Sequence, residues 1–178
     1  RMKSAKCALQ LFLRALPETA LFNIVSFGTD FSSLFNSSVP YSEDSFKKAK
    51  DHVESMNASF GGTDILKPLN HILKQKSDPS VPRQIFFLTD GEDSNEKEII
   101  STLKSNIGTS TRVFPFGIGA EASVDLLKKM GSIGRGRVEL AKNDMNLSSK
   151  VMRQMSDALK PTLKDVMINW GGKKQLYP

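Results

Sequence analysis

Cysteine and histidine are scarce in this sequence, and their scarcity excludes several kinds of site. Cys7 is the single cysteine among 178 residues, which rules out an internal disulfide and a cysteine-based zinc site. The two histidines, His52 and His71, fall in segments of helical periodicity far from any partner motif, so neither is expected to be a metal ligand or a general base. A lone cysteine fits a reducing compartment, and we expect a cytoplasmic protein, with secretion as the alternative.

Long apolar runs are also missing. No stretch approaches the roughly 20 apolar residues of a membrane helix, and no signal peptide opens the sequence. Charged residues make up 25% and hydrophobic residues 39% of the chain, which is typical of a globular domain. Because the first residues resemble the interior of a helix, we expect the chain to be part of a longer protein.

A concentrated basic patch is missing, although the net charge is +6. The lysines are spread along helical faces, whereas a nucleic-acid or membrane surface would need them clustered. Common catalytic motifs are missing as well: no P-loop lysine follows a glycine run, no G-x-S-x-G is present, and no nucleophile stands beside a base. We therefore expect neither catalysis, nor a nucleic-acid partner, nor insertion into a membrane.

What the sequence does contain is a strongly apolar strand followed by a polar turn. Residues 84–88 form a nearly continuous apolar run, typical of a strand buried on both faces of a parallel sheet. The run leads into Thr89-Asp90-Gly91. Ligands bind at the carboxyl ends of such strands, which makes Asp90 a candidate ligand residue. The alternative is a turn in which Asp90 only caps backbone N–H groups, and this stretch alone leaves both interpretations open.

Strand and helix patterns alternate along the chain. The predicted strands span residues 21–27, 31–35, 84–88, 113–118 and 137–141, with the first two paired antiparallel. The predicted helices span residues 1–16, 43–56, 122–130 and 144–159, with further helices capped by Thr63 or Asp64 and by Ser94. This order favours an α/β fold whose sheet is covered by helices on both faces.

A second polar loop, Gly61-Gly62-Thr63-Asp64, precedes one of these helices. Its two glycines allow backbone N–H groups to approach a ligand or a neighbouring loop. Hydroxyl and carboxylate oxygens suit hard cations such as Mg²⁺, Ca²⁺ or Mn²⁺, so Thr63 and Asp90 are the candidate metal ligands. Two residues cannot fill an octahedral shell, so waters, other loops or a partner carboxylate must supply the other ligands.

A third motif offers a different function. Gly117-Ile118-Gly119-Ala120-Glu121-Ala122 satisfies the dinucleotide pattern G-x-G-x-x-A between a strand and a helix, and Glu139 follows at about the spacing of a ribose-binding acid. A nucleotide-dependent oxidoreductase is therefore the alternative function. The pattern lies on a late strand, however, whereas the fingerprint normally opens the first βαβ unit. A glycine-lined strand exit packed under a loop is the favoured interpretation.

Four blocks of the sequence resemble the von Willebrand factor type A domain, and they occur in the order of that family. The blocks are residues 22–28, 61–65, 83–91 and 113–119. They are most similar to the subgroup with inter-α-trypsin inhibitor heavy chains, vault poly(ADP-ribose) polymerase and von Willebrand A domain-containing protein 5A. The resemblance implies a Rossmann-like, doubly wound, mostly parallel sheet and a non-enzymatic adhesion or protein-interaction role.

The resemblance also implies a metal-ion-dependent adhesion site (MIDAS) at the top of the sheet. Thr63 and Asp90 correspond to the threonine and aspartate on its second and third metal loops. The candidate partner-binding residues surround these two: Gly61, Gly62, Asp64, Gly91 and Glu92. The expected partner is a protein, which supplies an acidic residue to the metal or a strand to the sheet.

The sequence departs from the family in one respect. The family's first strand ends in Asp-x-Ser-x-Ser and forms the middle of the sheet, and this sequence does not contain it. We expect residues 1–160 to form the domain without that strand, and residues 161–178 to be a linker or the start of a following module. Mg²⁺ binding is then expected to be weak or absent. An upstream segment or a separate chain is expected to place a strand between residues 21–27 and 84–88, and the alternative is that these two strands close up and change register.

Overall fold

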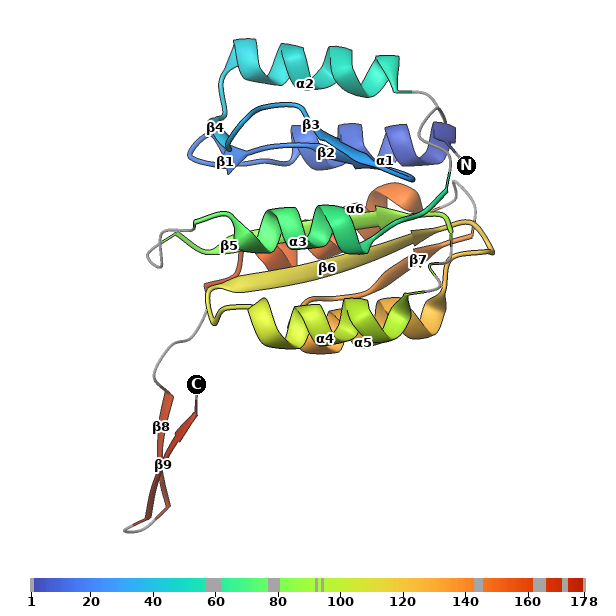
Figure 1. Ribbon diagram of the computed structural model, residues 1–178. Helices are drawn as coiled ribbons and strands as arrows, with labels where there is room; N and C mark the ends of the chain where they lie inside the picture. The colour runs from blue at the N-terminus through green and yellow to red at the C-terminus, as the bar shows by residue number, and fades with distance from the viewer. Residues whose placement is uncertain are drawn as a thin grey trace.

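A computed structural model describes residues 2–56, 62–76, 81–91, 93, 95–142, 146–161, 166–170 and 173–177 (Figure 1). The helices are α1 (Met2–Arg14), α2 (Glu43–Ser55), α3 (Leu66–Lys74), α4 (Glu96–Asn106), α5 (Val124–Ile133) and α6 (Leu147–Ala158). The strands are β1 (Leu21–Phe22), β2 (Val25–Phe27), β3 (Phe31–Ser33), β4 (Val39–Pro40), β5 (Arg83–Thr89), β6 (Thr111–Ile118), β7 (Glu139–Ala141), β8 (Val166–Trp170) and β9 (Lys173–Tyr177). Helices and strands alternate as the sequence predicts.

The parallel sheet β5-β6-β7 is the centre of the molecule. Strand β5 pairs with β6 over its full length, from Arg83 opposite Thr111 to Thr89 opposite Gly117. Strand β7 then pairs with the last part of β6. Because all three strands run in the same direction, the loops that follow β5 and β6 leave from one edge of the sheet.

Helices cover both faces of this sheet, which confirms the doubly wound α/β fold (Figure 1). On one face, α1 and α6 pack against apolar side chains of β5 and β6, with their contacts at Phe86, Leu88, Phe116 and Ile118. On the other face, α3, α4 and α5 pack against the alternate side chains, Ile85, Phe87 and Val113. Strand β5 thus contributes to two cores, as its apolar run predicts.

The predicted strand over residues 21–27 is interrupted at Asn23. Its side-chain oxygen accepts hydrogen bonds from Ile24 N (2.8 Å) and Phe35 N (3.0 Å), and its side-chain nitrogen donates to Phe35 O (2.8 Å). These bonds replace a strand ladder locally. The result is two short antiparallel ladders, β1 with β4 and β2 with β3, so the predicted antiparallel pairing is confirmed and the single long strand is wrong.

Strands β2 and β5 belong to separate sheets. Within the described ranges, no strand pairs with the edge of β5 that faces away from β6. The two strands meet only through side chains: the rings of Phe27 and Phe87 stack with their centroids 5.3 Å apart. The two strands are thus not paired directly with each other, and such pairing would have contradicted a strand between them. The additional strand stays a prediction.

Several helix starts differ from the sequence patterns. The N-cap of α3 is Ile65 without a side-chain hydrogen bond, although the Asp64 carboxylate accepts from Lys67 N at 3.2 Å. Ser94, the predicted cap of α4, lies outside the described residues, and Asn95 occupies the N-cap position without a side-chain bond. Helix α5 starts at Val124, two residues later than predicted, because the Ser123 hydroxyl accepts from Leu126 N.

The C-terminal residues form an antiparallel hairpin of β8 and β9. This hairpin lies in residues 161–178, which we expect to be a linker or the start of a following module, and the division of the chain near residue 160 stays a prediction. Among the described helices, none has the length and apolar character that crossing a membrane requires.

Candidate functional site

The candidate site lies where β5 ends and the chain turns. Thr89, the last residue of β5, is buried, and its hydroxyl accepts a hydrogen bond from Gly91 N at 3.3 Å. Thr89 therefore contributes a side-chain hydrogen bond to this turn. Asp90 is exposed, and no hydrogen bond joins its carboxylate to another described residue. Since Glu92 and Ser94 lie outside the described residues, both the ligand interpretation and the turn-capping interpretation of Asp90 stay open.

The second predicted loop packs directly against this turn. A Cβ atom placed on Gly91 would lie only 2.7 Å from the Thr63 hydroxyl oxygen, so a side chain at position 91 would force Thr63 to shift. A Cβ on Gly62 would lie 3.1 Å from the hydroxyl oxygen of Thr29, in the turn after β2. Thr63 thus lies against the residue that follows Asp90, on the same edge of the sheet.

Hydrogen bonds hold three loops together at this edge. Asp64 N donates to Gly28 O at 2.7 Å, which joins the loop before α3 to the β2–β3 turn. The Asp93 carboxylate accepts from Ile65 N and from Asn95 N, each at 2.7 Å. It therefore connects the loop after β5 both to the start of α3 and to the start of α4. The loops form one connected surface rather than independent segments.

A lysine also belongs to this surface. The Lys67 ammonium donates to Thr29 O at 2.9 Å and lies 3.2 Å from the Asp64 carboxylate. Asp64 is half-buried, and its carboxylate is already paired with the Lys67 ammonium. Asp90 differs from it, since its negative charge lacks a cation partner in the described part of the chain.

The predicted site residues have different outcomes. Thr63 and Gly91 are half-buried and in contact, Gly62 and Asp90 are exposed, and Asp64 is engaged by Lys67. Gly61 and Glu92 lie outside the described residues, so their proposed role stays a prediction. The sequence patterns missed Thr29, Lys67 and Asp93, which no motif marks. The only available signal was the position of Asp93, which directly precedes a predicted helix start, where carboxylates often accept from backbone N–H groups.

The described residues do not complete a metal site. They offer the hydroxyl of Thr63 and the carboxylate of Asp90, whereas Mg²⁺ takes six oxygen ligands in near-octahedral geometry. The Asp93 carboxylate already accepts two backbone hydrogen bonds. In the part of the chain that the structure describes, no group of three His, Cys, Asp or Glu side chains is placed to hold a metal ion.

The dinucleotide-like motif after β6 is occupied by protein contacts. A Cβ on Gly117 would lie 2.8 Å from both Leu127 and Leu140, so this glycine allows close packing. Gly119 N donates to Ala141 O at 2.8 Å and is not available to a phosphate. Glu139 is 8% exposed and is held by two hydrogen bonds from Arg153, at 2.8 and 3.0 Å. The oxidoreductase alternative is therefore not favoured.

Both histidines contact serines, although neither was expected to be a metal ligand or a general base. His52 Nε2 is 3.0 Å from the Ser26 hydroxyl, and His71 Nε2 is 3.4 Å from the Ser33 hydroxyl. Burial lowers the pKa of His52. Ser26 is only 5% exposed on β2, so a substrate cannot reach its hydroxyl. These pairs are best explained as packing contacts.

Comparison with known proteins decides the family. A family model described as von Willebrand factor type A domain matches residues 1–140. The chain belongs to this family. Domains of the von Willebrand factor type A family are generally protein-interaction or adhesion modules, which agrees with the resemblance seen in the sequence.

Curated relatives support the assignment. Human von Willebrand factor A domain-containing protein 5B1 is 37% identical over 169 residues, which cover 95% of this chain and 14% of that protein. Protein 5A of Rattus norvegicus is 35% identical over 170 residues, 96% of this chain and 21% of the relative. A von Willebrand factor A domain-containing protein of Dictyostelium discoideum is 36% identical over 170 residues, 96% of this chain and 18% of the relative. The chain thus spans about a fifth of these relatives or less.

Solved structures show the same fold. A von Willebrand factor type A protein from Catenulispora acidiphila superposes with a TM-score of 0.78 at 20% identity, over 93% of this chain and 40% of that one. Proximal thread matrix protein 1 from the mussel byssus, with a zinc-occupied MIDAS motif, has a TM-score of 0.66 at 17% identity, over 88% of this chain and 40% of its own. At these identities the likeness concerns the fold.

Proposed function

We propose that this von Willebrand factor type A domain binds a partner protein at the sheet edge where β5 ends. The observation that carries the proposal is the exposed Asp90 carboxylate, which has no partner among the described residues. It stands beside the Thr63–Gly91 contact, on loops that Asp93 and Asp64 connect. A charge held on a connected surface loses little conformational freedom when a partner binds. We propose no catalysis by this domain.

A divalent cation is the second element of the proposal. Mg²⁺ is the first choice, and Ca²⁺ or Mn²⁺ the alternatives, because the available side-chain ligands are oxygens. Thr63 and Asp90 would supply two of the ligands. Since these two do not complete the shell, we expect weak affinity for this chain alone, with waters and an acidic side chain of the partner as the remaining ligands.

A strand is the third element. Strand β5 offers an edge with no pairing strand in the described ranges, and β2 lies across from it with the Phe27 and Phe87 rings in contact. We propose that an additional strand, from an upstream segment or a partner, pairs with this edge. Strand addition supplies main-chain hydrogen bonds along the whole edge, and buried N–H and C=O groups require such partners.

A capture experiment with two matched variants tests the proposal. The 178-residue chain, Asp90→Ala and the control Asp51→Ala would each be used to capture proteins from cell extract, with Mg²⁺ or with EDTA. Asp51 is an exposed carboxylate on α2 and is not one of the candidate site residues. We expect one captured protein that is lost with Asp90→Ala and with EDTA, and retained with Asp51→Ala.

The outcomes separate the parts of the proposal. Capture that Asp90→Ala leaves unchanged would contradict binding at this edge. Capture that depends on Asp90 but resists EDTA would keep the partner site and remove the cation. Micromolar affinity for NAD(H) or NADP(H) that is lost with Gly119→Val would overturn the proposal in favour of the oxidoreductase alternative.

A further inference from the structure

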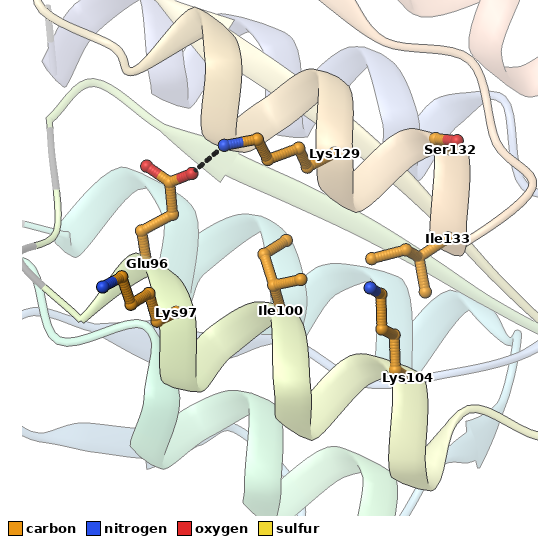
Figure 2. Close-up of a pocket in the computed structure, with 7 residues that line it drawn as sticks. All are labelled: Glu96, Lys97, Ile100, Lys104, Lys129, Ser132 and Ile133. Atoms are coloured by element: carbon orange, nitrogen blue, oxygen red, sulfur yellow. Dashed lines mark hydrogen bonds and ion pairs between the residues drawn. The ribbon is translucent and has the colours of Figure 1, made fainter.

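A groove between α4 and α5 forms a second distinctive surface, separate from the loops around Asp90. It has a volume of about 440 Å³, and its lining residues are Glu96, Lys97, Ile100, Lys104, Lys129, Ser132 and Ile133. Figure 2 shows Ile100 of α4 facing Ile133 of α5, with the Glu96–Lys129 pair at one end and Lys104 near the other. The groove therefore has an apolar floor and a basic rim.

The helix packing explains why the floor is apolar. Helix α4 buries Ile99 and Leu103 in the core, and α5 buries Leu126, Leu127 and Met130. Ile100 and Ile133 lie at the outer margin of the same core and stay half-buried. Apolar side chains that are half-covered at the bottom of a groove gain from further burial, at roughly 25 cal/mol per Å² of apolar surface.

The charges around this floor are mostly positive. Lys129 donates a hydrogen bond to the Glu96 carboxylate at 2.5 Å, and this bond raises the pKa of Lys129. Lys97 and Lys104 are exposed, and neither makes a hydrogen bond or ion pair with another residue that the structure describes. The rim thus presents, on the side of α4, two ammonium groups that pair with none of the described residues.

The spacing of these lysines defines the shape of a matching ligand. Lys97 and Lys104 are two helical turns apart, about 10.5 Å along the helix axis, with Ile100 between them. A second helix lying along α4 has the same rise per residue, so its side chains two turns apart have the same spacing as the two lysines. Acidic side chains two turns apart on that helix would face both lysines, and an apolar side chain between them would reach the Ile100–Ile133 floor.

We propose that this groove binds an acidic amphipathic helix of a partner protein. Charge complementarity selects the acidic residues of that helix, and the two isoleucines select its apolar face. A small inorganic anion would leave the floor uncovered. The proposal concerns a different surface from the Asp90 edge, and either can be correct without the other.

A designed peptide serves as the probe. The peptide is a helix of about 15 residues with two glutamates two turns apart and leucines between them on the same face. Its two control peptides replace the glutamates with glutamine or the leucines with serine. Binding is measured by fluorescence anisotropy against the 178-residue chain. Backbone amide shifts then identify the contacted helices.

Two double variants carry the same change of charge. Lys97→Glu with Lys104→Glu alters the groove, whereas Lys47→Glu with Lys48→Glu alters exposed lysines of α2. We expect the groove variant to weaken peptide binding by about tenfold or more, and the α2 variant by less than about threefold. Both control peptides should bind about tenfold more weakly, and the amide shifts should concentrate in α4 and α5.

Three results would overturn the proposal. The first is no binding of the acidic peptide at about 1 mM, the weak end of specific association. The second is equal loss of binding for the two double variants, which would indicate general attraction to a basic protein. The third is recognition that does not use the apolar floor. It would appear as full binding by the serine control peptide, or as a single-stranded oligonucleotide that binds more tightly than the acidic peptide in competition.

Discussion

The ends of β5 and β6 occupy equivalent places in the fold but differ in what they offer to a ligand. Both strands end at the same edge of the sheet, and both lead into glycine-containing turns. After β5, the Asp90 carboxylate is exposed and has no partner among the residues that the structure describes. After β6, Gly119 N is bonded to Ala141 O, and Glu139 of the neighbouring strand is held by Arg153. We propose that the first end binds a partner, whereas the second is part of the packing.

This difference shows that a glycine motif has to be judged by the partners of its polar groups. The pattern after β6 matches a nucleotide-binding fingerprint in sequence. Its Gly119 amide and its Glu139 carboxylate, however, both form hydrogen bonds within the protein. The turn after β5 has a less specific pattern, yet its carboxylate is exposed and bonds to none of the described residues. Mutations at the two ends should therefore affect stability and binding in opposite ways.

The largest effect is expected at the packed end. Gly117→Val would force atoms into space where even a Cβ is 2.8 Å from Leu127 and Leu140, so we expect a loss of about 3 kcal/mol in the free energy of unfolding. Gly108→Val is the control, because a Cβ there meets nothing within 4 Å, and its cost should stay below about 0.5 kcal/mol. Urea denaturation measures both. Equal stability of the two variants would contradict the close packing after β6.

The next effect concerns the loop connection after β5. Asp93→Ala removes the acceptor of Ile65 N and Asn95 N, and Ile65 is fully buried. We expect a loss of about 1–2 kcal/mol, because a buried N–H group is left without its charged acceptor. Hydrogen exchange at the Ile65 amide should accelerate as well. Unchanged exchange at that amide would show that the three loops do not depend on Asp93.

A paired carboxylate provides the reference for Asp90. Asp157 accepts from Arg137 and from Lys160, the latter at 2.6 Å, and these bonds lower the pKa of Asp157 from 3.8 to about 2. A carboxylate with a lowered pKa stabilises the fold above its unfolded pKa, and this contribution disappears as the pH falls from about 4 to about 2. Since both cations are largely exposed, we expect Asp157→Asn to cost less than about 1 kcal/mol at pH 7. It should also flatten the acid limb of the stability curve, and an unchanged acid limb would contradict the pairing.

The smallest effect on stability is expected at Asp90. Asp90→Ala in EDTA should change the free energy of unfolding by less than about 0.5 kcal/mol, because its carboxylate bonds to no described residue. Thermal denaturation with and without Mg²⁺ completes the test: any stabilisation of the parent chain by Mg²⁺ should vanish in the variant. A loss of several kcal/mol in the free energy of unfolding in EDTA would instead support the turn-capping interpretation.

Much of the fold followed from patterns that depend on local chemistry. The apolar run of β5 and the helical spacing of α1, α2 and α6 predicted their elements to within a few residues. The predicted element boundaries were wrong where a side chain forms hydrogen bonds with backbone groups. Asn23 divides a strand that its neighbours favour, and Ser123 moves the start of α5. Such bonds depend on residues distant in the chain or on a competing cap, and apolar periodicity does not report them.

The site was predictable only in part for a similar reason. Thr63 and Asp90 follow element ends, and the rule for parallel sheets places such residues at one edge. Their surroundings depend on contacts between loops that no spacing encodes, such as Lys67 with Thr29 O. The histidines illustrate the same limit, since Ser26 lies next to His52 across 26 positions of sequence.

The hydrogen bonds of Asn23 also indicate where this domain tolerates added sequence. They fix Phe35 on one side of the exposed residues 36–38, and the bond from Tyr41 N to Ala20 O, 2.9 Å long, fixes the other side. Both ladders are thus anchored outside this short loop, so a longer loop does not shift their register. A peptide tag or a fluorescent label inserted after Ser37 should leave the sheet edges and the groove intact, which provides a handle for the capture and binding experiments.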